Sequence, residues 1–391
     1  MITEVNIIRV KESNNFVGLR IKKKSIDVYV PWLYRLKENP LQNDKEGLIN
    51  FLKSINLAKT QVPGNISNSS NIGEVWPIES FIWILSDFLS NGLYFSIERK
   101  NDYNNGTVNW KKTLKQQPMI SNNQFFYTKL CTSYRSLTSN TITQIYSFCV
   151  NISCSRIGWL YGEMFKLDTD VYLSIEEMIY LLEQERSKTF DDEKRIRFGH
   201  MIKILSNIDN DNLRNSNFVF GITNYYYVFE RMVDVMFGNI YDKKIYQPRS
   251  KWVLLDEKEV QANPLMPDTI LKKKDIIYLI DAKLYQYGIN SDTRYLPGSQ
   301  SIQKQITYGD FLMNNLNISE VRNIFILPNN NEVDLFSYFG YAQADWRNTD
   351  GEIPHEKIFG FFVDLRYLVT NYQLGNNFFT YEMCRIVEEK L

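Results

Sequence analysis

Two acidic residues and a lysine flank a strand, turn and strand pattern in the second half of the chain. Pro267-Asp268 is followed by twelve residues and then by Asp281-Ala282-Lys283. Between them, residues 268–271 predict a short strand, residues 272–275 a polar turn and residues 276–280 a buried strand, because β-branched and aromatic residues favour strands. A hairpin of this length brings both carboxylates to the same edge of a sheet.

These residue types suit the hydrolysis of a phosphodiester by a bound metal ion. Mg²⁺ prefers hard oxygen ligands, which Asp268 and Asp281 would supply, and Mn²⁺ is the alternative ion. Side chains alternate along a strand, so Lys283 points to the same face as Asp281 and would orient or help to deprotonate the attacking water. Ala282 points into the core and can offer its backbone carbonyl to the metal. The alternative is a salt-bridged hairpin without a catalytic role.

The pattern resembles the PD-(D/E)xK signature of metal-dependent nucleases, in which an acid after a proline opens one strand and an acid-x-lysine triplet ends the next. More widely, the chain is similar to the LlaJI-type restriction endonuclease family, which is related to the McrC-like nuclease subunit of McrBC systems. The resemblance covers most of residues 76–365, and the first 75 residues match nothing. It is carried by Phe229-Glu230, residues 264–268, residues 280–285, residues 296–299 with Tyr308-Gly309, and an upstream block from residues 76–80 to residues 106–113.

This resemblance implies roles for residues on two expected helices. Residues 225–238 read as an amphipathic helix on which Glu230 would be a further metal ligand or base, the alternative being an ion pair on a solvated face. Residues 299–314 read as the helix after the lysine strand, where related nucleases carry a glutamine and a tyrosine that support the site and contact the DNA backbone. Here the residue four positions before Tyr308 is Lys304, so either Lys304 or Gln305 takes the supporting role beside Tyr308.

The expected fold class is α/β, or α+β overall, with a restriction-endonuclease-like mixed sheet flanked by helices. Strand-like runs at residues 323–327 and 358–365 continue the alternation of strand and helix that such a sheet requires. A chain of 391 residues suits two or three domains. Residues 63–71 are the best linker candidate. The expected domains are a small β-rich N-terminal domain at 1–70, a mixed helical and strand domain at 71–215, and the PD-(D/E)xK nuclease domain at 216–391.

Charge and missing motifs suggest a division of labour. The chain has 45 basic and 45 acidic residues, which lowers the expectation of strong DNA binding by this chain alone. It has no G-x-x-x-x-G-K-[ST] loop, so we expect it to bind no nucleotide. The resemblance implies a nuclease subunit that cuts double-stranded DNA together with a separate McrB-like GTPase that recognises the DNA. Because both strands are cut, two copies are expected to meet on DNA.

Other functions remain open at this point. The same core motif suits a nuclease of DNA repair or of mobile-element processing, and a non-catalytic subunit that binds DNA or a partner is a third alternative. With only two histidines, a histidine-metal nuclease has little to work with, and His355 is expected at the surface or in a loop. The start of the chain has no basic segment before an apolar core, and no apolar run is long enough to span a bilayer. We therefore expect a cytoplasmic protein with no membrane contact.

Overall fold

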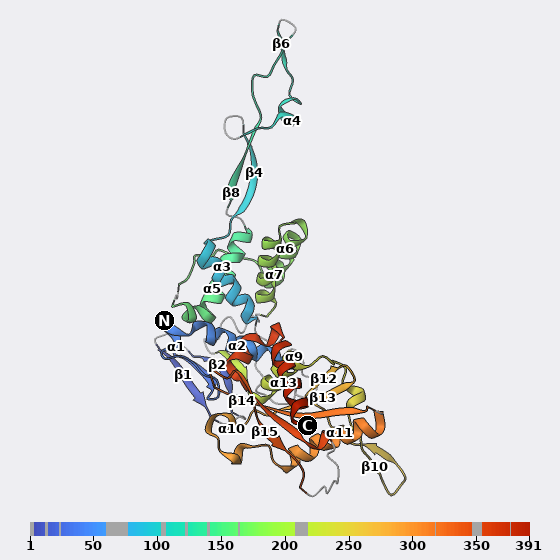
Figure 1. The fold of residues 1–391 in the computed structure, drawn as a ribbon. Helices are drawn as coiled ribbons and strands as arrows, with labels where there is room; N and C mark the ends of the chain where they lie inside the picture. Colours follow the sequence, from blue (N-terminus) through green and yellow to red (C-terminus); the bar gives the residue numbers. More distant parts are fainter. Residues whose placement is uncertain are drawn as a thin grey trace. The chain divides into compact units, whose positions relative to one another are not determined.

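The structure of the chain, a computed structural model, groups into two compact units (Figure 1). Unit 1 combines residues 1–76 with 215–391, and unit 2 is residues 77–214. The expected domains at 1–70, 71–215 and 216–391 stay a prediction; contacts group the first of these ranges with the last in unit 1. The expected linker at residues 63–71 lies outside the described residues. The structure describes residues 4–11, 15–22, 25–59, 77–102, 107–121, 124–138, 141–162, 165–207, 218–316, 318–345, 354–375 and 377–391.

The first sheet of unit 1 confirms the strands expected near the start of the chain and adds a distant one. Its order is β1-β3-β2-β9, with β1 parallel to β3, and β2 antiparallel to both β3 and β9. The β2–β9 pair needs glycine, because Gly18 has φ +143° and a Cβ there would lie 2.2 Å from the carbonyl oxygen of Phe220. The strands are β1 (Glu4–Val10), β2 (Val17–Ile21), β3 (Ser25–Pro31) and β9 (Phe218–Ile222).

The second sheet of unit 1 is the mixed sheet that the hairpin pattern predicts. Its order is β12-β13-β14-β16-β15; β13, β14 and β16 are parallel, and the two outer strands run antiparallel to their neighbours. The expected strands at 268–271, 276–280, 323–327 and 358–365 are confirmed, but β15 was not predicted. The bounds are β12 (Thr269–Lys273), β13 (Ile276–Ala282), β14 (Glu320–Asn329), β15 (Phe336–Ala342) and β16 (Ile358–Asp364).

Helices cover both faces of this sheet because its inner strands are apolar on both sides. On one face Ile277 and Leu279 pack against Tyr308 and Leu312 of α11. On the other, the hydroxyl of Tyr278 donates to Glu388 of α13 over 3.2 Å. The helices of unit 1 are α1 (Pro40–Asn43), α2 (Lys45–Lys59), α9 (Tyr226–Phe237), α10 (Tyr287–Asn290), α11 (Ser299–Leu316), α12 (Leu365–Asn371) and α13 (Asn377–Lys390), with short 3-10 turns η1 (Lys244–Tyr246), η2 (Thr293–Tyr295), η3 (Pro354–Glu356) and η4 (Tyr372–Leu374), and a separate hairpin of β10 (Lys251–Val253) and β11 (Glu259–Gln261).

An ion pair joins the N-terminal and C-terminal parts of unit 1, with its carboxylate buried and its guanidinium partly exposed. Asp44, which precedes α2, accepts two hydrogen bonds from the guanidinium of Arg366 on α12, at 2.5 and 2.6 Å. Its Oδ2 also accepts the backbone N–H of Lys37 at 3.0 Å. A buried charge of this kind is tolerated because its partner satisfies it.

Unit 2 is a helical body that carries an extended β-ribbon. In the body, Arg197 of α7 pairs with the buried Asp87 of α3 at 2.8 Å, and Asp87 also accepts the hydroxyl of Tyr146 on α5. Among the described residues, no helix is long and apolar enough to cross a membrane. The elements are α3 (Ile78–Asn91), β4 (Ser96–Asp102), β5 (Thr107–Val108), α4 (Trp110–Thr113), β6 (Met119–Ser121), β7 (Gln124–Phe126), β8 (Thr132–Thr138), α5 (Thr141–Tyr161), α6 (Ile175–Lys188) and α7 (Asp192–Ser206).

The expectation for His355 was wrong about its exposure. His355 lies in the 3-10 turn η3 and is buried, with Nε2 at 2.8 Å from Oδ1 of Asp310. It packs so closely on α11 that a Cβ at Gly309 would lie 2.5 Å from the imidazole. The lone histidine of this segment is therefore a packing residue between helix and sheet.

Candidate active site

The hairpin of β12 and β13 brings the two predicted aspartates together. Thr269 pairs with Ile280 in the antiparallel ladder, so the flanking residues Asp268 and Asp281 lie at the same end. The backbone N–H of Ala282 donates to Oδ2 of Asp268 at 3.1 Å. Asp281 is only 1% exposed although it is an aspartate. Both aspartates thus sit where β13 leaves the sheet, as the sequence pattern predicted.

Two lysines approach Asp281 from different elements. The Nζ of Lys283 lies 2.5 Å from Oδ2 of Asp281, and the Nζ of Lys304 on α11 lies 3.4 Å from Oδ1. Burial opposes the charge on Lys283, but the carboxylates of Asp281 and Asp268 outweigh it and raise the pKa of Lys283. Lys283 is therefore a stable cation, which suits charge stabilisation better than proton removal.

Glu230 reaches the same cluster from the predicted helix α9, which packs against β12 and β13. Burial raises the pKa of Glu230 to about 8, and the charge of Asp268 adds to the effect. Burial likewise raises the pKa of Asp268 to about 7, with the charge of Asp281 contributing. Perturbed carboxyl groups that share one site are typical of functional clusters.

The choice between Lys304 and Gln305 is one of helix rotation. Lys304 faces the cluster, with its Nζ 5.6 Å from the ring centre of Tyr308. Tyr308 lies fully buried below it, and burial, with the charges of Asp268 and Asp281, raises the pKa of its hydroxyl. Gln305 is also buried, and its backbone carbonyl accepts the side-chain amide of Asn323. The structure therefore brings Lys304 and Tyr308 to the site, whereas the buried side chain of Gln305 has its Oε1 unpaired among the described residues.

Sequence reasoning missed a lysine that ties α9 to β12. Lys243 donates to Oδ1 of Asp234 at 2.8 Å and also to the backbone carbonyl of Asp268. Asp234 lies one turn after Glu230 on α9 and is held from the other side by Arg231. Lys243 thus fixes the helix that carries Glu230 against the strand that carries Asp268. Lys243 lies in an irregular segment that gives no periodic signal. The only indication in the sequence was an acidic residue, Asp234, one helical turn after Glu230.

The charges of the cluster favour a bound cation. Three carboxylates, from Glu230, Asp268 and Asp281, face two ammonium groups, so full ionisation leaves one negative charge in excess. No three histidine, cysteine or acidic side chains within the described ranges converge as a preformed metal site. The donors are carboxylate oxygens, the ligands that Mg²⁺ and Mn²⁺ accept.

Taken together, fold and site describe a mixed α/β protein with an acid and lysine cluster at the end of a buried strand, the arrangement of a candidate metal-dependent hydrolase. The family model of the LlaJI restriction endonuclease matches residues 65–356. The chain therefore belongs to the LlaJI restriction endonuclease family, as the resemblance indicated. Membership of this family implies nuclease activity.

Other comparisons add less. No curated protein matches the chain. Among solved structures, a chain of a half-complex from a tetradecameric assembly of Thermococcus gammatolerans McrB AAA+ hexamers with bound McrC matches with a TM-score of 0.41 and 12% identity, over 94% of this chain and 82% of that chain. Likeness at that TM-score establishes neither a shared fold core nor a shared partner.

Proposed function

We propose that this chain is the nuclease subunit of a restriction system and that it hydrolyses duplex DNA with Mg²⁺ through a PD-(D/E)xK site. The observation that carries the proposal is the meeting of Asp268, Asp281 and Lys283 at the end of β13, with Glu230 beside them. Family membership supports the reaction class. The cytoplasm, where foreign DNA arrives, is the proposed location.

The proposed ligands for the metal are the carboxylates of Asp268 and Asp281, with Glu230 and the backbone carbonyl of Ala282 as further donors. A bound Mg²⁺ would polarise a phosphoryl oxygen and lower the pKa of a water molecule. Mn²⁺ has the same preference for these oxygen donors and is the expected substitute.

The chain's own residues would do the rest of the chemistry. Glu230, as the alternative to binding the metal, would accept a proton from the attacking water; a cation bound nearby would favour the ionised carboxylate that this role requires. Lys283 stays cationic and would stabilise the charge that develops on the phosphate. Lys304 adds a second positive charge at the other carboxylate oxygen of Asp281, where it would hold the DNA backbone with support from Tyr308.

A separate partner would choose where to cut. The sequence has no phosphate-binding loop and no net charge, so nucleotide hydrolysis and strong DNA binding are assigned to a McrB-like GTPase. Cutting both strands needs two sites, so two copies of this chain would meet on DNA. Family membership and the sequence support this arrangement.

The decisive test is loss of cleavage on substitution of Asp281 or Lys283. Unmodified plasmid DNA is incubated with Mg²⁺ and the chain, with and without its partner subunit. Asp281→Ala and Lys283→Ala should abolish cleavage while folding and partner binding persist. The matched controls are Asp275→Ala and Lys274→Ala in the turn of the same hairpin, which should cut like wild type because both residues are exposed and lie at the opposite end of β13.

Retained cleavage in either site variant would sink the assignment. Cleavage that survives EDTA would reject the metal-dependent reaction. If wild type neither cuts DNA with its partner nor binds Mg²⁺ or Mn²⁺ in a calorimetric titration, the chain is a non-catalytic subunit.

A further inference from the structure

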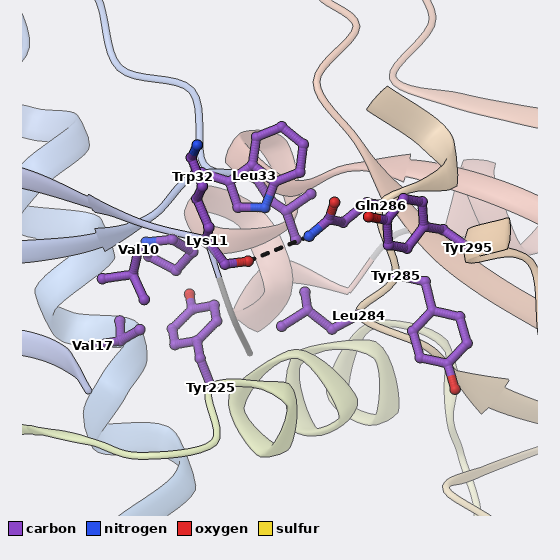
Figure 2. A pocket seen from close by; sticks show the side chains of 11 residues that line it. Val10, Lys11, Val17, Trp32, Leu33, Tyr225, Leu284, Tyr285, Gln286 and Tyr295 are labelled. Carbon is purple, nitrogen blue, oxygen red and sulfur yellow. Dashed lines mark hydrogen bonds between the residues drawn. The ribbon is translucent and has the colours of Figure 1, made fainter. Parts of the chain in front are cut away.

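A pocket of about 400 Å³ opens in unit 1 one residue beyond Lys283 (Figure 2). Residues 284–286 form one wall, and the end of β1 with the segment after β3 forms the opposite one. Small-molecule sites in proteins commonly enclose roughly 300–1,000 Å³. The volume of the pocket therefore suits one small organic group.

Flat aromatic side chains and hydrogen-bonding groups line the pocket together. Trp32, Tyr285 and Tyr295 supply the aromatic rings, and Lys11 and Gln286 the polar groups. The Nε1 of Trp32 is buried and has no hydrogen-bond partner within the described part of the chain. Buried N–H groups are costly to leave unpaired, so a ligand that accepts this hydrogen bond would gain from it.

Hydrogen bonds fix the pocket wall relative to the candidate active site. The backbone N–H of Lys283 donates to the backbone carbonyl of Ile326 at 2.9 Å. The backbone N–H of Tyr285 donates to the carbonyl of Lys283 at 2.8 Å. The side-chain amide of Gln286 donates to the carbonyl of Lys11 at 3.3 Å, across the pocket. A tight turn therefore connects Lys283 to Tyr285 in the wall of the pocket.

We propose that the pocket receives an unpaired nucleobase of the DNA strand whose phosphate lies at Asp281 and Lys283. This inference rests on the proposed function. Because the wall starts at the residue after Lys283, the base of a nearby nucleotide is the flat group closest to it. The ring of Tyr295 stacks on a face of the base, and the indole N–H of Trp32 donates to an acceptor on its edge. Stacking of this kind accepts any base, since every base has a π-face.

A binding cycle tests the contact between base and pocket. Two short single-stranded oligonucleotides of equal length, one normal and one with all bases removed, are titrated against the full chain in Ca²⁺, an ion chosen to prevent cleavage. Wild type should bind the normal strand about tenfold more tightly or better, the gain typical of stacked bases. Trp32→Ala and Tyr295→Ala should each remove most of this preference. Tyr295 is 38% exposed, so its loss should leave folding intact.

The exposed Tyr241, a surface tyrosine outside the pocket, provides the matched control. Tyr241→Ala should keep the full preference for the normal strand. An unchanged preference in both Trp32→Ala and Tyr295→Ala would overturn the proposal, even if cleavage depends on Asp281 as proposed. Conversely, cleavage that survives Asp281→Ala would reject the proposed function. The preference of the chain for the normal over the base-free oligonucleotide is measured separately, so the two failures can be told apart.

A second arm separates a base of the strand from a free nucleotide. Deoxyadenosine monophosphate carries the same base without the rest of the strand. If the pocket serves the strand, this nucleotide should bind at least tenfold more weakly than the normal oligonucleotide, because it lacks the neighbouring phosphates. Equal affinities, both lost in Trp32→Ala, would assign the pocket to a free nucleotide and overturn its assignment to DNA.

Discussion

Asp268→Asn should stabilise the metal-free protein at alkaline pH although it removes a proposed metal ligand. Burial and the charge of Asp281 raise the pKa of Asp268 to about 7, whereas an aspartate in an unfolded chain titrates near 3.9. The difference of roughly three units corresponds to about 4 kcal/mol as an upper bound, at about 1.4 kcal/mol per unit. Because part of the side chain meets solvent, we expect about 1–3 kcal/mol.

The sign follows from where the proton is held. Between about pH 4 and pH 7 the folded protein keeps a proton on Asp268 that the unfolded chain has released, so the wild-type free energy of unfolding falls as pH rises. Glu230 extends this fall to about pH 8. Asparagine has no charge to bury, and its side-chain oxygen can still accept the N–H of Ala282. The gain should be near zero only below about pH 4, roughly a third of its full size at pH 5 and complete at pH 8.5.

Asp44→Asn is the matched control with the opposite sign. Although burial alone would raise the pKa of Asp44, its hydrogen bonds to Arg366 and the N–H of Lys37 outweigh burial and lower that pKa. Its ionised form therefore stabilises the folded state above the ordinary pKa, and this contribution is lost as pH falls through the folded pKa. Because the guanidinium of Arg366 is partly exposed, loss of the charged hydrogen bonds should cost about 1.5–3 kcal/mol.

Urea unfolding in EDTA at pH 5 and pH 8.5, followed by circular dichroism, measures these differences. Both substitutions lie in unit 1, so an unchanged transition of unit 2 serves as an internal reference. Mg²⁺ should restore stability to wild type at pH 8.5, by about 2.7 kcal/mol at a hundred times its Kd, and restore less to Asp268→Asn. The reasoning is refuted if Asp268→Asn is less stable than wild type at pH 8.5, or if its gain is the same at both pH values.

Two further predictions concern positioning and packing. Lys243→Ala should weaken Mn²⁺ binding about 10–100-fold, as loss of a residue that orients metal ligands does, and Lys243→Arg should recover much of the affinity. Lys244→Ala, at the exposed neighbour, should leave Mn²⁺ binding unchanged. Equal Mn²⁺ affinities of Lys243→Ala and wild type in calorimetry would contradict a positioning role. Gly18→Ala should destabilise unit 1 more than Gly340→Ala: both glycines have φ near +140°, a strain of about 1–3 kcal/mol for alanine, but only Gly18 meets Phe220. Equal urea midpoints for the two alanine variants would show that β2 and β9 move apart to accommodate the Cβ without loss of stability.

Local patterns predicted the parts of the fold that short-range sequence determines. The hairpin, α9 and α11 follow from periodicity within a few residues, and the register of β12 on β13 places Asp268 beside Asp281. Strand β15 escaped prediction because it is an aromatic outer strand with a bulge near Gly340, so its burial does not alternate cleanly. Pairing of β9 with β2 joins residues about 200 positions apart and leaves no local signal.

For the candidate site, the sequence predicted which residues lie together but not the hydrogen bonds and ion pairs that position them. Asp268, Asp281, Lys283 and Glu230 were named before their surroundings were known. Whether Lys304 or Gln305 faces Asp281 depends on the rotation of α11, which is set by packing of Ile306 and Tyr308. Lys243 acts through a backbone carbonyl, and such contacts depend on three-dimensional placement alone.

The position of β9 also has a consequence for how the chain is made. While the ribosome synthesises the chain, β2 emerges early, but its partner β9 follows only after all of unit 2. At about 5–20 residues per second, the delay is roughly 10–40 seconds. For that time the N-terminal sheet has an open edge that can pair with another nascent chain. Unit 2 can fold during the delay, and the first sheet of the nuclease is completed only when the segment that follows unit 2 arrives.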